Sequence, residues 1–144
     1  MKLAVLTPSV TALAQPTIED IGQLSELGYR SIISNRPDGE TSDQPDFAQI
    51  AQAAARHGME ALHIPLSLGQ LDNSQIAAFR EALNRLPRPI AAFCRSGTRA
   101  ALLWALANEA NLTVNERLLI AEQEGFDLEP FRALMEKGSL DGDA

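Results

Sequence analysis

The sequence has few of the residues that cross-link a chain or bind a metal. It holds a single cysteine in 144 residues, which cannot form an internal disulfide bond, so nothing indicates an oxidising compartment. That cysteine and two separated histidines give no metal-ligand spacing, and we expect no metal and no cofactor. The chain must therefore fold on its apolar residues, which make up 45% of it and suffice for the core of one domain.

Positive charge and long apolar runs are also scarce. Lys and Arg number 12 against 19 Asp and Glu, which gives a formal net charge of -7. Because this field repels polyanions, we expect neither nucleic acid nor a membrane surface as a partner. No stretch approaches the roughly 18 apolar residues of a membrane span. Any site for an anion must therefore be built locally.

The chain begins with MKLAVLTPSVTALAQ, in which one lysine precedes a small-residue Ala-Leu-Ala like a signal-peptidase site. Residues 7–11, TPSVT, interrupt the apolar run and leave only a short hydrophobic stretch. We therefore expect this segment to be retained and the protein to be cytoplasmic. We expect one domain over residues 1–144, with flexible ends at residues 1–10 and 138–144.

Helix and strand signals alternate along the rest of the chain. Six stretches carry helical spacing or capping residues: residues 17–27, 45–57, 74–86, 99–110, 113–125 and 130–137. Three short runs are rich in strand formers: residues 29–34, 60–65 and 89–93. This order predicts an α/β fold, a single domain with a mostly parallel central sheet flanked by helices.

Three loops are predicted to meet at one edge of that sheet. They are NRPDGE after the first strand, PLSLGQLDN after the second and CRSGTR after the third. Each follows the carboxyl end of a strand, and ligands of parallel sheets bind beyond those ends. We therefore expect the functional site where these loops come together.

Cys94, the lone cysteine, follows a buried strand and precedes a helix. The backbone amides of residues 95–99 can curl around its sulfur and the helix dipole adds positive potential, so the position favours a thiolate. Gly97 allows the close turn that such a cradle requires. The alternative is an inert core cysteine, but the order of strand, loop, glycine, arginine and helix favours a catalytic nucleophile.

Five polar residues are candidates for holding an anionic substrate. Arg99 is a candidate catalytic residue, and Arg95 also attracts an anion. Ser96 and Thr98 can offer hydroxyl groups to the sulfur or to a bound oxyanion. Arg36, in NRPDGE, lies at the same predicted edge and can reach the substrate, with an Arg-Asp pair that fixes the loop as its alternative role.

The order of these segments resembles a known family. Three segments within residues 10–110 carry the resemblance: TIEDIGQLSELGYRSIISNRPDGE, LHIP and AFCRSGTRAALLWA. They look like the small bacterial family of beta-lactamase-hydrolase-like phosphatase or sulfurtransferase domains, of the DUF442 type, found alone or fused to persulfide-dioxygenase-type metallohydrolases. The resemblance implies a cysteine-phosphatase-like fold of the dual-specificity type, a loop similar to that of rhodaneses, and a persulfide-dioxygenase-type partner.

The length of the cysteine loop separates the two activities that the resemblance implies. In the phosphatase signature Cys-x-x-Gly-x-x-Arg, the arginine stands six positions after the cysteine and clasps the phosphoryl oxygens. Here Gly97 matches, but the sixth position is Ala100 and the arginine is Arg99, at the fifth. The shorter loop is the rhodanese-like pattern that begins Cys-Arg-x-Gly, and its amides suit the outer sulfur of a persulfide better than a phosphate.

A phosphatase of this type also needs a general acid that protonates the leaving group. In HIPLSLGQLD the expected place, three residues past Pro65, holds Leu68. Asp72 lies further on and can instead cap the next helix. Asp38, in NRPDGE, is the other candidate catalytic acid, with a turn role as its alternative. Sulfur transfer needs no such acid, because thiolate and sulfite are good leaving groups.

These observations predict a rhodanese-like sulfurtransferase. Cys94 takes the sulfane sulfur of thiosulfate or a persulfide, carries it as a cysteine persulfide and passes it to a thiol acceptor. The alternative is a dual-specificity-type phosphatase, in which Cys94 forms a phosphocysteine, Arg99 grips the phosphoryl group and Asp38 or Asp72 is the acid. A third alternative is a non-catalytic anion-binding module. The expected partner is accordingly a small anionic sulfur donor or a phosphate ester.

Overall fold

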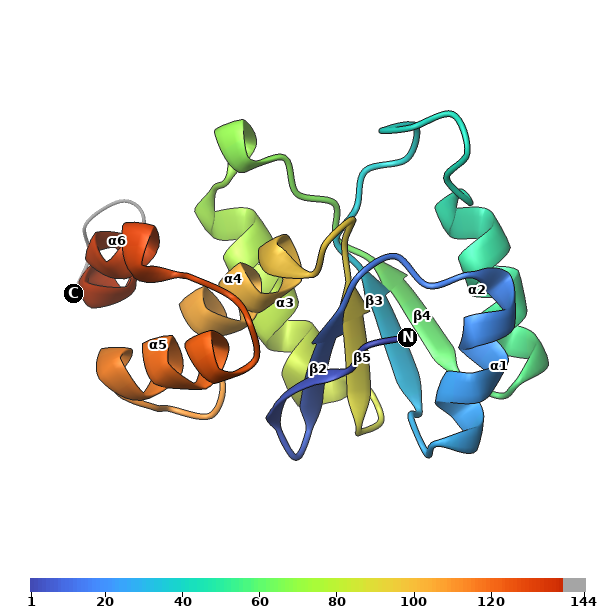
Figure 1. Cartoon of the computed structure of the whole chain (residues 1–144), viewed down its shortest axis with the longest axis horizontal. Helices are drawn as coiled ribbons and strands as arrows, with labels where there is room; N and C mark the ends of the chain where they lie inside the picture. The colour runs from blue at the N-terminus through green and yellow to red at the C-terminus, as the bar shows by residue number, and fades with distance from the viewer. Residues whose placement is uncertain (139–144) are drawn as a thin grey trace.

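A five-stranded sheet forms the centre of the molecule in the computed structural model, which describes residues 1–138 (Figure 1). Its strands are β1 (Ala4–Thr7), β2 (Val10–Leu13), β3 (Ser31–Ser34), β4 (Glu60–His63) and β5 (Ile90–Phe93). They lie in the order β1-β2-β5-β3-β4. The last four strands in this order run parallel, while β1 pairs antiparallel with β2 at one edge. The mostly parallel sheet predicted from the sequence is confirmed.

Helices cover both faces of this sheet. Six α-helices are described: α1 (Ile18–Glu26), α2 (Phe47–Arg56), α3 (Asn73–Arg85), α4 (Thr98–Ala107), α5 (Val114–Gln123) and α6 (Arg132–Lys137). Two short 3-10 helices add to them: η1 (Leu68–Gln70) and η2 (Glu129–Phe131). In Figure 1, α1 and α2 lie on one side of the sheet and α3 and α4 on the other, with α5 and α6 beyond α4. The flanked α/β architecture is therefore also confirmed.

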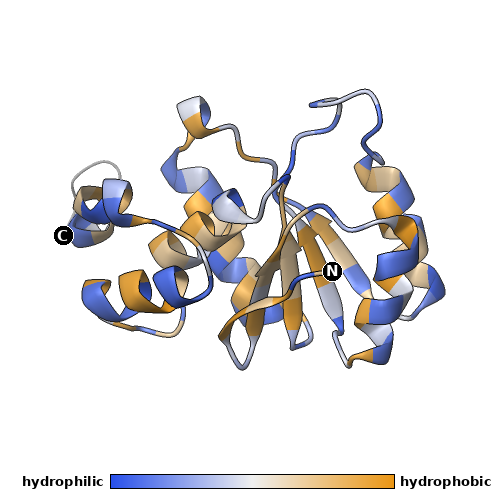
Figure 2. Ribbon diagram, in the orientation of Figure 1, coloured by the Kyte–Doolittle hydropathy of each residue, from blue (hydrophilic) through white to orange (hydrophobic). Residues whose placement is uncertain are grey.

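The two apolar layers follow from the alternation of side chains along each strand. Ile32 packs with the apolar faces of α1 and α2, whereas its neighbour Ile33 packs with α3 and α4. All four residues of β5 are buried, and they alternate between the same two clusters. Figure 2 shows the apolar residues on the strands and on the helix faces that meet them. A strand buried on both faces must be continuously apolar, as the PIAAF run is.

Capping residues set the starts of several helices. Thr17 and Asp20 form a capping box at α1, and Thr113 and Glu116 form one at α5, as their spacing predicts. Asp72 caps α3, where its carboxylate accepts from the backbone N–H groups of Ser74 and Gln75. The sequence offered helix capping as the alternative role of Asp72, and this is the role observed.

The N-terminal segment differs from its expected form. Residues 1–10, expected to include a flexible end, contain β1 and the first residue of β2. Strand β1 pairs with β2 at the edge of the sheet, and β2 pairs with β5 over four residues, so this segment is part of the sheet. Of the other expected flexible end, residues 139–144 lie outside the described residues. Within residues 1–138 no helix combines the length and the apolar content that crossing a bilayer requires.

Helix α4 connects the predicted site to the core. Every residue from Ala100 to Ala107 is buried, so the last carbonyls of this helix need partners inside the protein. Arg117 donates to the carbonyl of Ala105, and Arg80 donates to that of Ala107 at 2.7 Å. These cations also complement the helix dipole at its carboxyl end. The helix is thus fixed at the end remote from the cysteine loop.

Candidate active site

Cys94 lies at the carboxyl end of β5, at the start of the loop that leads into α4. Its side chain is fully buried, with 0% of its surface exposed, and its thiol is free. The backbone N–H of Gly97 donates to its Sγ at 3.1 Å. The turn between strand and helix thus directs a backbone dipole at the sulfur, which stabilises a negative charge there.

Gly97 has a conformation that few other residues can adopt. Its φ of +95° is in the left-handed region, and a Cβ at this position would lie 3.0 Å from Cζ of Phe126. The same Cβ would lie 3.2 Å from the carbonyl carbon of Leu13. Both the backbone angle and the space around it therefore require glycine.

Replacing Gly97 by alanine is expected to lower the free energy of unfolding by roughly 1–3 kcal/mol. Alanine disfavours the positive φ of this position, and its methyl group would lie too close to Phe126 and Leu13. Urea denaturation of the variant measures this loss. Gly69→Ala is the matched control, since a Cβ there meets no atom within 4 Å. An equal loss in both variants would mean that the close packing at Gly97 has no energetic weight.

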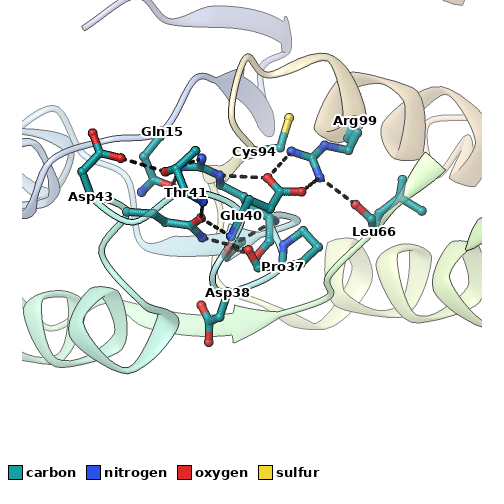
Figure 3. A network of polar contacts seen from close by, with 12 residues as sticks. Gln15, Pro37, Asp38, Glu40, Thr41, Asp43, Leu66, Cys94 and Arg99 are labelled. Carbon is teal, nitrogen blue, oxygen red and sulfur yellow. Dashed lines mark hydrogen bonds and ion pairs between the residues drawn. The ribbon is translucent and has the colours of Figure 1, made fainter. Parts of the chain in front are cut away.

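Arg99 is held beside the cysteine loop by an acid and a carbonyl. Its two terminal nitrogens donate to Glu40, at 2.6 Å to Oε2 and 2.8 Å to Oε1, and one of them also donates to the Leu66 carbonyl at 2.9 Å (Figure 3). The pKa of Arg99 is raised, first by the hydrogen bond to Glu40 and also by the attraction of Cys94. The guanidinium therefore remains charged next to the sulfur.

Glu40 was not among the predicted site residues, although it ends the quoted segment NRPDGE. It lies between two cations, since Arg36 also donates to its Oε1, at 3.0 Å. The hydrogen bond from Arg99 lowers the pKa of Glu40 to about 2, with a further contribution from Arg36. The carboxylate is ionised at neutral pH. The available signal in the sequence was an acid four residues after an arginine.

The low pKa of Glu40 predicts a loss of stability in acid. Because the pKa of Glu40 is lower in the folded state than its ordinary value of 4.5, its ionised carboxylate stabilises the fold at pH values above 4.5. This contribution to stability disappears as the pH falls towards about 2. The melting temperature of the wild type should exceed that of Glu40→Gln at pH 7, and the difference should close over this interval. Exposed Glu26 supplies the control Glu26→Gln, which should follow the wild type throughout. A difference that persists unchanged to pH 2 would contradict this assignment.

Arg36 is buried and has three polar partners. Besides Glu40, its guanidinium donates to Gln15 Oε1 at 3.0 Å and to Thr41 Oγ1 at 3.3 Å. It was predicted to bind substrate, whereas the contacts observed are those that hold the loop and Glu40 in place. The sequence offered an Arg-Asp pair as the alternative role of Arg36, and the acid that pairs with it is Glu40 instead.

Asp38 is not brought to the sulfur. It is exposed, and its Oδ1 accepts from the backbone N–H of Phe47, at the start of α2, at 2.9 Å. In Figure 3 its carboxylate points away from Cys94. Leu68, which occupies the place where an acid was expected, lies exposed in η1. The observed contact of Asp38 therefore joins its loop to the start of α2.

The other predicted loop residues surround the cysteine. Ser96 is exposed, and its hydroxyl donates to that of Thr98 at 3.1 Å. Arg95 is exposed and lines a polar cavity of about 250 Å³ together with Gln15 and Asp43. Arg95, the residue after Cys94, therefore presents its charge to this cavity.

Asn35 links the three loops at this edge, and no sequence signal singled it out. Its backbone N–H donates to Phe93 O at 2.7 Å, and its carbonyl accepts from Leu66 N–H at 3.0 Å. Its side-chain Nδ2 donates to Ile64 O at 2.9 Å. The carbonyl of Leu66 in turn accepts from Arg99. Buried Asn35 therefore helps to fix the position of Arg99 relative to the cysteine loop.

Known proteins resemble this chain in sequence and in structure. A beta-lactamase hydrolase-like protein of Agrobacterium fabrum is 34% identical over 130 residues, which cover 89% of this chain and 30% of that protein. A structure from Neisseria meningitidis Z2491, with a provisional phosphatase assignment, has a TM-score of 0.85 and 34% identity over 96% of this chain and 99% of its own. The chain thus spans about 30% of the length of the curated relatives it matches.

A more distant structure shares the fold. Pseudomonas aeruginosa TpbA, solved in complex with phosphotyrosine, has a TM-score of 0.70 and 18% identity, over 98% of this chain and 86% of its own. The fold is therefore that of the cysteine phosphatases, as the resemblance implied. Residues 2–111 match the sequence model of a family, the beta-lactamase hydrolase-like protein, phosphatase-like domain. This chain belongs to that family.

Proposed function

We propose that this chain is a cysteine-dependent phosphatase that hydrolyses phosphate esters through Cys94. The observation that carries the proposal is the position of its sulfur, which accepts from Gly97 N–H beside the charged guanidinium of Arg99. The phosphatase folds of the structural neighbours, and the phosphotyrosine bound to TpbA, support this reaction over sulfur transfer.

The reaction has two steps. The Cys94 thiolate attacks phosphorus, a sulfur-phosphorus bond forms, and the ester oxygen leaves with the electron pair of its bond to phosphorus. Water then attacks the phosphocysteine, which releases inorganic phosphate and restores the thiolate. The N–H groups of Arg99 that are not bonded to Glu40 or Leu66 bind the oxygens that gain charge, and backbone amides of the loop add to this.

The site constrains the leaving group. The carboxylate beside Arg99 is that of Glu40, and with a pKa of about 2 it has no proton to give at neutral pH. Asp38 points away from the sulfur, and Asp72 caps α3. Asp43, which lines the cavity with Arg95, also has a lowered pKa, first because of its hydrogen bond with Thr41. Since none of these described carboxyl groups is placed to donate a proton, we expect the enzyme to favour esters whose leaving oxygen is stable as an anion.

This constraint predicts a strong preference for aryl over alkyl phosphates. General acids contribute typically 10²–10⁴-fold, so we expect kcat/KM for p-nitrophenyl phosphate to exceed that for phosphoserine at least about hundredfold. A series of substituted phenyl phosphates should show a steep dependence of kcat on the pKa of the phenol. Equal rates across the series would require an acid at the site or a rate-limiting second step, which single-turnover measurements distinguish.

Sulfur transfer is the second candidate, and the short loop favours it. Residues 94–97 lead directly into α4, so Arg99 already lies in the first turn of the helix. In this reaction the Cys94 thiolate attacks the outer sulfur of thiosulfate, the sulfur-sulfur bond breaks, and sulfite leaves with its electron pair. A thiol then takes the sulfur from the persulfide. A small sulfur donor and a persulfide-dioxygenase-type partner remain predictions of the resemblance.

One pair of assays tests the two candidates. The purified protein is given p-nitrophenyl phosphate, and separately thiosulfate with cyanide as the acceptor, with Cys94→Ser as the control in each. We expect turnover of the phosphate ester that the variant lacks. Formation of thiocyanate without phosphate hydrolysis would replace the phosphatase with the sulfurtransferase, and turnover of neither would favour an anion-binding module.

A further inference from the structure

A phenylalanine from the C-terminal part of the chain lies against the cysteine loop. Phe126 follows α5, outside the residues 2–111 that match the family. Its ring is half-buried and packs on the core cluster that includes α4. A Cβ on Gly97 would lie 3.0 Å from its Cζ and 3.2 Å from its Cε1, so the ring borders the place that a side chain at Gly97 would take.

This contact restricts the one backbone group that donates to the sulfur. The Phe126 ring and the Leu13 carbonyl carbon both border the space that a Cβ of Gly97 would occupy, so together they close one side of this glycine. Glycine has wide conformational freedom, so the loop itself does not fix the direction of its N–H. Displacement of Gly97 towards this side would bring its Cα against the ring or against the end of β2. The ring therefore acts as a wall that keeps the N–H directed at Cys94 Sγ.

The space around Phe126 shows what its loss would allow. A cavity of about 160 Å³ lies behind the loop, between Ser96, the end of β2 and Phe126. The ring also lines a more open surface hollow with Glu122 and Asp127. Because the ring borders both spaces, its removal would enlarge them and leave Gly97 without this neighbour. The packing at Gly97 thus depends on this side chain together with the Leu13 backbone.

We propose that Phe126 is a positioning residue of the active loop: from the C-terminal segment, it holds Gly97 so that its N–H points at the sulfur of Cys94. The effect on turnover rests on the proposed function, whereas the effect on the loop does not. Small displacements of catalytic groups have large effects on rate, so we expect loss of the Phe126 ring to change kcat more than KM.

Kinetics provide the first test. Phe126→Ala should lower kcat for p-nitrophenyl phosphate by about tenfold or more with little change in KM, and Phe126→Leu should recover most of the loss. Phe131→Ala is the matched control, because Phe131 packs on the same core cluster from the same segment. Equal losses in Phe126→Ala and Phe131→Ala would reduce Phe126 to a general packing residue and overturn the proposal.

The second test needs no turnover. In protein labelled with ¹⁵N-glycine, the Gly97 amide signal is identified as the one displaced most by Cys94→Ala. Phe126→Ala should displace the same signal in the same direction, Phe126→Leu less so, and Phe131→Ala should leave it in place. An unmoved Gly97 signal in both Phe126 variants would overturn the proposal. Should the wild type lack phosphatase activity, the proposed function fails while this measurement still decides the role of Phe126.

Discussion

Replacing Cys94 by serine is expected to abolish hydrolysis of p-nitrophenyl phosphate, with a loss on the order of 10⁴-fold or more in kcat. The reason is chemical, because a serine hydroxyl remains protonated at neutral pH, and the Glu40 carboxylate beside Arg99, with a pKa of about 2, is too weak a base to take its proton. The Gly97 N–H and Arg99 can stabilise a thiolate there, but they cannot make an alkoxide available. The rate is measured from release of p-nitrophenol.

The fold should survive this change. Serine is slightly smaller than cysteine and its hydroxyl can accept from Gly97 N–H, so we expect a melting temperature close to that of the wild type. This control separates loss of chemistry from loss of structure. A well-folded Cys94→Ser variant that retains even a tenth of the wild-type rate would exclude Cys94 as the nucleophile.

Replacing Arg99 by alanine is expected to lower kcat/KM by roughly 10³-fold, because the transition state loses a charged, pre-oriented donor to its oxygens. Glu40 and the Leu66 carbonyl hold this guanidinium before substrate arrives, so little reorganisation is needed. Arg99→Lys keeps the charge but loses the planar pair of donors, and it should recover only part of the activity. Steady-state kinetics with p-nitrophenyl phosphate measure both variants.

The control is an arginine remote from the loop. Arg56 is exposed in the last turn of α2, and Arg56→Ala changes the net charge by the same amount. It should keep wild-type kinetics. If Arg56→Ala lost as much activity as Arg99→Ala, the effect would be one of overall charge, and the role given to Arg99 would be wrong.

The sheet and most helices could be predicted because their signals are local. A continuous apolar run specified β5, and the capping boxes at Thr17 and Thr113 specified two helix starts. The hairpin of β1 and β2 had no such signal, since Pro8 and its polar neighbours interrupt it. Strand β2 is stabilised by its parallel pairing with β5, which lies 80 residues further along the chain, since Val10 pairs with Ile90. Such a non-local partner cannot be read from a short window.

The site shows the same division between local and distant interactions. The order of residues around Cys94 predicted a nucleophile, a glycine turn and Arg99, and the structure shows Gly97 N–H donating to the Cys94 sulfur. Asp38 was a candidate and Glu40 was not, because both belong to one loop and only its folded path decides which carboxylate meets Arg99. Phe126 was out of reach for a similar reason, since it meets Gly97 only after the C-terminal helices have packed.

The loop length favours transfer of a sulfur atom, whereas the fold favours transfer of a phosphoryl group. In either reaction the transferred group is bound covalently to Cys94 for part of the cycle. An arginine at the fifth position after Cys94 is the rhodanese-like feature, whereas the family and the structural neighbours are phosphatase-like. Both reactions use the same nucleophile, the same positive site and leaving groups that need no proton. They differ in what Cys94 carries between the two half-reactions, so the adduct itself must be observed.

Intact-protein mass spectrometry after rapid mixing with p-nitrophenyl phosphate and an acid quench measures this adduct most directly. We predict that the wild type gains the mass of one phosphoryl group during turnover, that peptide mapping places it on Cys94, and that Cys94→Ser gains nothing. Wild-type protein that takes up one sulfur atom from thiosulfate, but never a phosphoryl group from the ester, would contradict the phosphatase proposal.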